Sequence, residues 1–321
     1  MGTVVHVPQT RDMVGEELSG DEAFAALRRY GGRKLLIDSF ARFRYADGFS
    51  FARSLGYQVV LGIVPFTIAL VGIATTMHTE SIGRAIELAL AGIVPGVSGD
   101  VVRQVLSDTR RSAGGDTAGA VAMWMGLVFA VVNLASAMGQ VERGCNRIYG
   151  IERDRPFAVK YGRGMLLALF AGLPLGGGFL AIVAGRDIGR AVVRAAHWPP
   201  SLLTWWDHLH LPVGVVLAAL ASAVVFRWAP RRDQPGYTWL VFGSCVHLLL
   251  WVGATVLLAL YINTSGSFGA VYGPLSAFVA LLLWANVTGA ALFLGIAFAA
   301  QLEAARAGIT RPVHPDPGPG R

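Results

Sequence analysis

The sequence predicts an all-α, polytopic membrane protein with about six membrane-spanning helices. Of its 321 residues, 54% are hydrophobic and only 15% are charged, whereas a soluble domain carries roughly 25% charged residues. Five long stretches lack Asp, Glu, Lys and Arg, and the last of them, residues 234–302, is long enough for two crossings of about 20 residues each. This composition argues against a soluble enzyme, a nucleic-acid-binding domain and a disordered scaffold.

The charge-free stretches divide the chain into three parts. We expect a cytoplasmic N-terminal segment over residues 1–32, a transmembrane domain over 33–305 and a cytoplasmic tail over 306–321. The tail contains four prolines and is expected to be disordered. The predicted spans lie near residues 55–76, 117–139, 165–185, 211–228, 239–261 and 273–299.

The stretch before the first span, residues 33–53, has the pattern of an amphipathic helix. Its apolar and charged positions recur at helical spacing: Leu36, Ile37, Phe40 and Phe43, with Lys34, Arg42 and Arg44. The pattern predicts an interfacial helix on the inner leaflet. A short soluble helix packed on the loops is the alternative.

Two further features concern the first span and the loop after it. Pro65 removes a backbone donor within the first span, so we expect a kink there that serves either as a gating hinge or as a static bend. The outer loop, residues 77–116, carries two apolar stripes separated by Pro95-Gly96. It is therefore expected to form two amphipathic helices on the outer surface.

The distribution of basic residues predicts the orientation. Of the 27 Lys and Arg residues, 20 lie in the N-terminal segment, the even-numbered loops and the tail, and seven lie in the odd-numbered loops. Because cytoplasmic loops are enriched in Lys and Arg, both termini are expected in the cytoplasm.

Polar residues within the predicted spans are candidates for a substrate path or a polar core. Those on the second span share one helix face, and the others lie on the last two spans: Asn133, Ser136 and Gln140, then His247, Asn286 and Thr288. Polar groups facing lipid would leave hydrogen bonds unmet, so these side chains should face the bundle. Hydrogen bonds between helices are the alternative to a path, and the central Asn286 requires a partner.

Charged residues form two further candidate sites. The block after the second span is an inner gate, a contact for anionic headgroups or a salt-bridged loop: Glu142, Arg143, Asn146, Arg147, Tyr149 and Arg155. In the second outer loop, Arg186, Arg190 and Arg194 share one helix face. They either hold anionic headgroups of the outer leaflet or snorkel from an interfacial helix.

Three regions of the sequence resemble one known family. They contain the motifs SLGY (54–57) with LGIVP (61–65), NRIYGIE (146–152) with RPF (155–157), and GAVYGPL (269–275) with ALLLW (280–284). Over residues 40–305 the chain resembles the YihY/BrkB family of bacterial inner-membrane proteins, once labelled ribonuclease BN. The family's Gly-Ala-Glu-Leu-Asn-type motif in the last span is replaced here by GIAFA (295–299), and Gln301 and Glu303 follow nearby.

The resemblance implies a bacterial inner-membrane protein that transports a lipid or an envelope amphiphile. A non-transporting scaffold or envelope-assembly factor is the alternative, because the predicted spans contain no acidic residue of the kind that ion-coupled transporters commonly use. The old ribonuclease label does not fit, because no HxHxDH run or carboxylate pair supports hydrolysis. We expect no enzymatic activity, no cofactor, no metal and no nucleic acid partner. The expected partners are membrane lipids, and the oligomeric state stays open.

Overall fold

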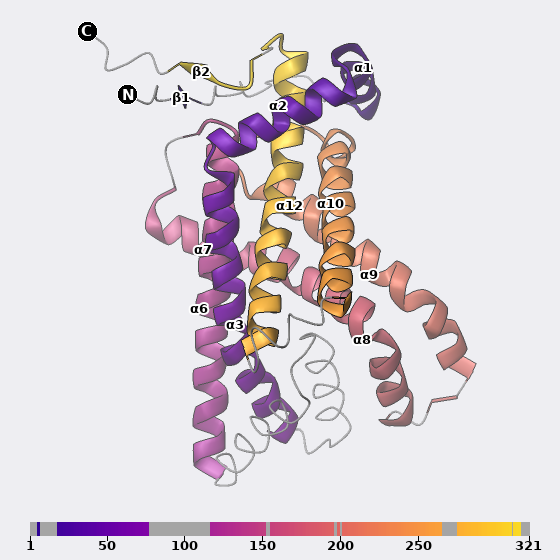
Figure 1. The fold of residues 1–321 in the computed structure, drawn as a ribbon. Coiled ribbons are helices and arrows are strands. Elements are labelled where there is room, and N and C mark those ends of the chain that lie inside the picture. Colours follow the sequence, from indigo (N-terminus) through magenta and orange to yellow (C-terminus); the bar gives the residue numbers. More distant parts are fainter. Residues whose placement is uncertain are drawn as a thin grey trace.

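A computed structural model of the chain describes residues 5–6, 18–76, 116–151, 155–195, 198–199, 201–264, 275–309 and 311–315. The all-α fold class is confirmed (Figure 1). In chain order the helices are α1 (Gly20–Tyr30), α2 (Gly32–Tyr45), α3 (Gly48–Thr76), α6 (Asp116–Ile148), α7 (Phe157–Leu167), the π-helix η1 (Ala168–Gly172), α8 (Leu173–Ala195), α9 (Ser201–Trp228), α10 (Tyr237–Thr264) and α12 (Ser276–Arg306).

Four helices in the described part of the chain are long and apolar enough to cross a membrane. They comprise Trp124–Ile148 in α6, Ser201–Trp228 in α9, Tyr237–Ile262 in α10 and Phe278–Arg306 in α12. An integral membrane protein with several apolar helices is thereby confirmed. The other two predicted spans fall in α3 and in α7–α8, which are helical but do not belong to this group, so the count of six stays a prediction. The amphipathic helices predicted for residues 77–116 lie outside the described residues, apart from Asp116 at the start of α6.

Both ends of the described chain lie at one end of the bundle. The short strands β1 (Val5–His6) and β2 (His314–Pro315) pair in antiparallel orientation, and they lie near α2 at the same end of the bundle as α1 (Figure 1). We call it the α1–α2 end. An even number of membrane crossings brings two chain ends to the same side, as a six-span arrangement requires. The tail that was expected to be disordered thus contains two residues in a strand pair, and residues 1–32 contain the helix α1.

Helix α2 differs from the predicted interfacial helix on one side. Leu36, Ile37 and Phe40 are exposed, as a lipid-facing surface requires, but Phe43 is fully buried. Its ring lies edge-on to Phe49 at a centroid distance of 4.7 Å. Arg42, expected among the surface charges, is also fully buried. The helix therefore has a second face that packs on the bundle, because positions 35, 39, 42 and 43 lie close together around a helix of 3.6 residues per turn.

The helices extend beyond the charge-free stretches that predicted them. Helix α6 continues nine residues past the predicted end at 139, so Glu142, Asn146 and Arg147 lie on a helix and not in a loop. It ends in a Schellman motif, in which the Ile151 amide donates to the Asn146 carbonyl and Gly150, at φ 76°, donates to the Arg147 carbonyl. A helix can continue through charged residues when their side chains form ion pairs or hydrogen bonds outside the apolar layer.

The second outer loop is shorter than predicted, because the helices on both sides of it extend into it. Helices α7, η1 and α8 continue from one to the next, and α8 runs to Ala195, while α9 begins at Ser201. The π-helical turn at Ala168–Gly172 lies just before Pro174, which has no amide hydrogen to give to the preceding turn. Helix α3 likewise continues through Pro65.

Glycines let neighbouring helices approach closely. A Cβ atom on Gly243 of α10 would lie 2.7 Å from the Gly295 carbonyl oxygen of α12, and one on Gly178 of α8 would lie 2.8 Å from the Gly214 carbonyl oxygen of α9. Within a bilayer, helices associate through such close packing because lipid tails are as apolar as the side chains. These contacts fix α8 against α9 and α10 against α12.

Candidate functional site

A buried layer of charged and polar side chains joins four segments at the α1–α2 end of the bundle. It comes from α2, from the end of α6 and the residues after it, from the α9–α10 connection and from α12. We call it the ionic layer and define it by Arg42, Glu142, Asn146, Tyr149, Arg155, Arg232, Gln301 and Glu303.

The strongest pair in the ionic layer joins Arg232 to Glu303. Arg232 Nη2 lies 2.5 Å from Glu303 Oε1, and Nη1 lies 3.2 Å from Oε2, so the contact is bidentate. Both side chains are 2% exposed. The Arg232 guanidinium also lies 4.8 Å from the centre of the Tyr149 ring, a cation–π distance. Burial raises the pKa of the Tyr149 hydroxyl, which stays neutral beneath the guanidinium.

Arg42 connects α2 to both α12 and α6. Its Nε donates to Gln301 Oε1 at 2.9 Å, and its Nη1 donates to the Ile148 carbonyl at 3.0 Å. The second contact satisfies a carbonyl at the C-terminus of α6, where cations are favoured. Burial lowers the pKa of Arg42 to about 10, against the opposing field of the Glu303 carboxylate. The guanidinium is still charged at neutral pH.

Glu142 and Asn146 hold the connection between α9 and α10. Arg155 Nη1 lies 2.8 Å from Glu142 Oε1, an ion pair whose angles are not those of a hydrogen bond. Arg155 also donates to the carbonyls of Ala229 and Pro230 at 3.2 and 3.0 Å. Asn146 Oδ1 accepts from the Arg231 amide at 2.7 Å. Residues 146–150 therefore do three things. They bond to the α9–α10 connection, they accept a hydrogen bond from Arg42, and they end helix α6.

The structure separates the predicted inner-gate residues into two groups. Glu142, Asn146, Tyr149 and Arg155 are buried or half-buried in the ionic layer, whereas Arg143 and Arg147 are exposed. The second pair remains available for headgroups. Sequence reasoning missed four members: Arg42, Arg232, Gln301 and Glu303. Only two of the four were marked by a local signal in the sequence: Gln301 and Glu303 directly follow the last predicted span.

The polar residues predicted as a path do not lie together. Asn133 Nδ2 donates to the Gln58 carbonyl of α3 at 2.7 Å, a hydrogen bond between helices. Ser136 and Gln140 are half-buried on the same helix. Asn286 is half-buried on α12, where its backbone nitrogen would lie 3.0 Å from a Cβ atom on Gly56. His247 of α10 lies against Gly295 of α12, and Thr288 is half-buried on α12.

The predicted outer arginines lie on α8. Arg186 and Arg190 are exposed one turn apart, while the Arg194 side chain lies outside the described part. Nearby, Trp206 Nε1 donates to the Gly185 carbonyl at 2.6 Å and ties α9 to α8.

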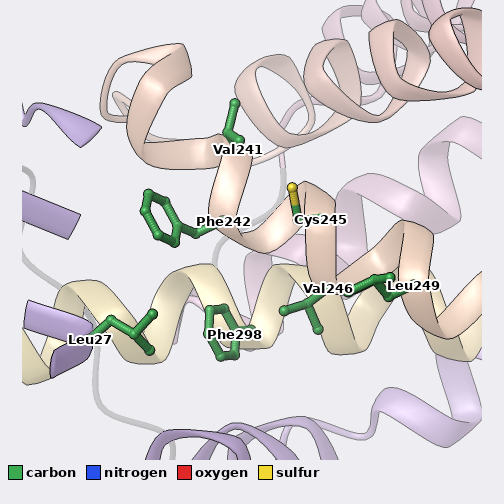
Figure 2. Close-up of a pocket in the computed structure, with 7 residues that line it drawn as sticks. All are labelled: Leu27, Val241, Phe242, Cys245, Val246, Leu249 and Phe298. Carbon is green, nitrogen blue, oxygen red and sulfur yellow. The ribbon is translucent and has the colours of Figure 1, made fainter. Parts of the chain in front are cut away.

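An apolar groove of about 320 Å³ runs along the outer side of α10 (Figure 2). Seven side chains line it, from α1, α10 and α12: Leu27, Val241, Phe242, Cys245, Val246, Leu249 and Phe298. Figure 2 shows Leu27 at one end and Leu249 at the other, with Phe298 between them. The groove opens sideways, because Val241, Cys245 and Leu249 are exposed. Its volume falls at the lower end of the range for ligand pockets, roughly 300–1,000 Å³.

Comparison with known proteins identifies the family. The family model described as virulence factor BrkB matches residues 39–317. The chain belongs to the BrkB family. This assignment agrees with the motif resemblance, and Asn146 and Tyr149 of its NRIYG motif lie in the ionic layer.

Curated relatives of this BrkB-family chain come from several bacteria. It is 20% identical over 81% of its length to the putative ribonuclease-like protein YfkH of Bacillus subtilis, covering 92% of that protein. It is 27% identical to a UPF0761 membrane protein of Chromobacterium violaceum and 24% identical to one of Chromohalobacter salexigens. The matches cover 78% and 83% of this chain but only 57% and 62% of those relatives. No solved structure matches the chain.

Proposed function

We propose that the protein binds a lipid or another envelope amphiphile and moves it across the bacterial inner membrane, as a transporter or flippase-like protein. The observation that carries this proposal is the apolar groove on α10. Its lining offers a polar solute no partner for a hydrogen bond, whereas a hydrocarbon chain loses nothing by entering it. The groove lies on a helix that is apolar and long enough to span the membrane.

The groove also lies at a suitable depth for a lipid tail. It begins at Leu27 of α1, at the α1–α2 end, and continues to Leu249, eight residues beyond Val241 on α10. At 1.5 Å per residue this is a distance of roughly 12 Å along the helix. A lipid whose headgroup lies level with α1 would therefore place the first part of its acyl chain in the groove. Arg28 and Arg29, exposed in the last turn of α1, are cations suited to an anionic headgroup.

The orientation and partners belong to the same proposal. The Lys and Arg distribution favours cytoplasmic termini, which would put the α1–α2 end and the ionic layer on the cytoplasmic side. The partners are membrane lipids. The proposal includes neither a nucleic acid partner nor a catalytic reaction.

A membrane scaffold is the second candidate, and the ionic layer favours it. The pairs Arg232–Glu303 and Arg155–Glu142 and the contact of Arg42 with Gln301 fasten four segments together. A scaffold needs such a rigid end, while a transporter needs at least one part of the bundle to move.

Lipid movement in vesicles tests the two candidates. The purified protein is reconstituted into liposomes that contain a fluorescent phospholipid in both leaflets, and an impermeant reductant quenches the outer leaflet. A transporter exposes the inner-leaflet lipid to the reductant, so quenching continues past half of the signal. Quenching that stops at half, as in protein-free liposomes, would reject the transport proposal and favour the scaffold.

A further inference from the structure

The side of α10 opposite the groove carries a row of polar side chains, three of them buried and the last half-buried. Ser244, His247, Trp251 and Thr255 follow one another at intervals of three, four and four residues. Ser244, His247 and Trp251 are 7%, 5% and 8% exposed. At 100° per residue these positions lie on one face of the helix. Cys245 and Leu249 of the groove lie on the other side.

Each member of this row has a buried polar atom that is left without a hydrogen-bond partner among the described residues. The atoms are Ser244 Oγ, His247 Nδ1, Trp251 Nε1 and Thr255 Oγ1, together with Thr288 Oγ1 on α12. Other hydroxyls of the bundle are satisfied locally. Ser222 on α9 donates to the Ala218 carbonyl at 2.8 Å, and Thr264 on α10 donates to the Leu260 carbonyl at 2.7 Å.

The row faces the inside of the bundle and not the lipid. Trp251 packs with Ala218 of α9 and Ala291 of α12 in one buried cluster. A Cβ atom on Gly295 of α12 would lie 2.6 Å from the His247 Cβ atom. Thr288 lies one turn from Ala291 on the same helix, so its hydroxyl is on the side of α12 that meets Trp251.

Unpaired polar atoms inside a bundle are candidates for hydration. Buried polar groups in proteins are nearly always hydrogen-bonded, and the hydrocarbon around a membrane protein offers no substitute. Buried water satisfies such atoms, and each molecule makes two to four hydrogen bonds at a polar site. The row offers both donors and acceptors, since an indole N–H donates while hydroxyls and imidazoles do both. A chain of water molecules fits this mixture, whereas an anion or a cation alone does not.

We propose that Ser244, His247, Trp251 and Thr255 of α10, with Thr288 of α12, line a file of water molecules inside the bundle. The file spans 11 residues of helix, roughly 17 Å of a bilayer core of about 30 Å. It is independent of the proposed lipid movement, which depends on the opposite side of α10. Helix α10 thus separates a hydrated interior from an apolar groove that faces the lipid.

Thiol accessibility in the bilayer tests the file. Ser244→Cys and Thr288→Cys are each made in a Cys245→Ala background, reconstituted in vesicles and treated with silver ion, a small water-borne thiol reagent. The control is Ala285→Cys, which lies on α12 near Thr288, is buried as Ser244 is, and packs against Val60 and Leu281. The unaltered protein, in which Cys245 faces the lipid, supplies the control for the other side of α10.

The two test cysteines should react at least about tenfold faster than Ala285→Cys, because the control reacts only after a local opening and each 1.4 kcal/mol of opening slows it tenfold. Cys245 should stay as slow as the control. Equal rates at Ser244→Cys, Thr288→Cys and Ala285→Cys would overturn the proposal.

Hydroxyl-radical footprinting repeats the test on the unaltered protein. Radicals generated from buried water by an X-ray pulse oxidise the side chains beside it. Oxidation is expected at His247 and Trp251 but not at Phe226 and Phe293, which are 1% and 0% exposed. Absence of oxidation at His247 and Trp251 would overturn the proposal without dependence on any variant.

Discussion

Arg232 and Glu303 form a buried, bidentate ion pair although they stand 71 residues apart in the chain. The pair fastens the α9–α10 connection to the end of α12, and both side chains are 2% exposed. A buried charge that loses its partner is left in a medium of low dielectric constant, so each residue depends on the other.

Replacing Glu303 with Gln should therefore destabilise the folded protein. We expect a loss of about 3–5 kcal/mol, because the Arg232 charge remains buried without its carboxylate. Thermal unfolding in detergent measures it. The matched control is Glu22→Gln, which breaks the exposed pair with Arg306 and should cost about 0–1 kcal/mol. Equal losses of stability in the two variants would show that the buried pair contributes no more than the exposed pair.

Arg42→Met should lower stability while Arg44→Met should not. Removing Arg42 leaves Gln301 Oε1 and the Ile148 carbonyl without their donor, at a cost of about 1–3 kcal/mol for each group that stays buried and unsatisfied. Arg44 is exposed on the same helix, so its replacement should change stability by less than about 0.5 kcal/mol. The difference in melting temperature between the two variants is the measurement. A difference near zero would contradict the role assigned to Arg42.

A methyl group at Gly243 should separate α10 from α12. Its Cβ atom would lie 2.7 Å from the Gly295 carbonyl oxygen, and overpacking of this kind typically costs about 1–3 kcal/mol. Gly253→Ala on the same helix meets no atom within 4 Å and should be neutral or stabilising by up to about 1 kcal/mol. Unfolding titrations measure the free energy of unfolding of both variants. If Gly243→Ala is as stable as Gly253→Ala, the close approach is not required.

Asn133→Leu should remove one hydrogen bond between α6 and α3. The expected loss is about 0.6 kcal/mol, the average for a hydrogen bond between membrane helices, because the Gln58 carbonyl lies within α3 and keeps its helical partner. Lipid movement per folded molecule should stay unchanged. The melting temperature and the vesicle assay are measured on the same sample. If the variant loses lipid movement while its stability is unchanged, Asn133 lines a substrate path.

The orientation predicts a labelling pattern in intact cells. In a Cys245→Ala background, an impermeant thiol reagent added from outside should modify Ser98→Cys, in the predicted outer loop, and should not modify Ala158→Cys, which is exposed at the start of α7. After the membrane is permeabilised, Ala158→Cys should react as well. The reverse order of labelling would contradict cytoplasmic termini.

The spans were predictable because the thickness of the bilayer sets the length of an apolar stretch. The ends of the helices were not, since backbone hydrogen bonds continue past the last apolar residue when a charged side chain has a partner. That partner is distant in sequence: Arg42 and Gln301 are 259 residues apart, and no local pattern connects them. For the same reason Arg42 was assigned to the surface.

The candidate groove was also beyond sequence reasoning. Its lining comes from α1, α10 and α12, and in the sequence Cys245 and Leu249 look like any other residues of an apolar span. The polar candidates were predictable as residues that face the bundle, as Asn133 does. Which of them lie together was not predictable, because the polar row on α10 depends on which face of that helix meets α12.

The comparison of two tryptophan variants on α10 tests the central claim most directly. Cys245→Trp fills the groove, whereas Val256→Trp places the same side chain on the same helix at an exposed position outside it. Lipid movement per folded molecule is measured in vesicles for both variants and for the unaltered protein. If the groove holds the acyl chain of the moving lipid, Cys245→Trp will lose most of the activity and Val256→Trp will keep it. If both variants move lipid as fast as the unaltered protein, the groove has no part in the function.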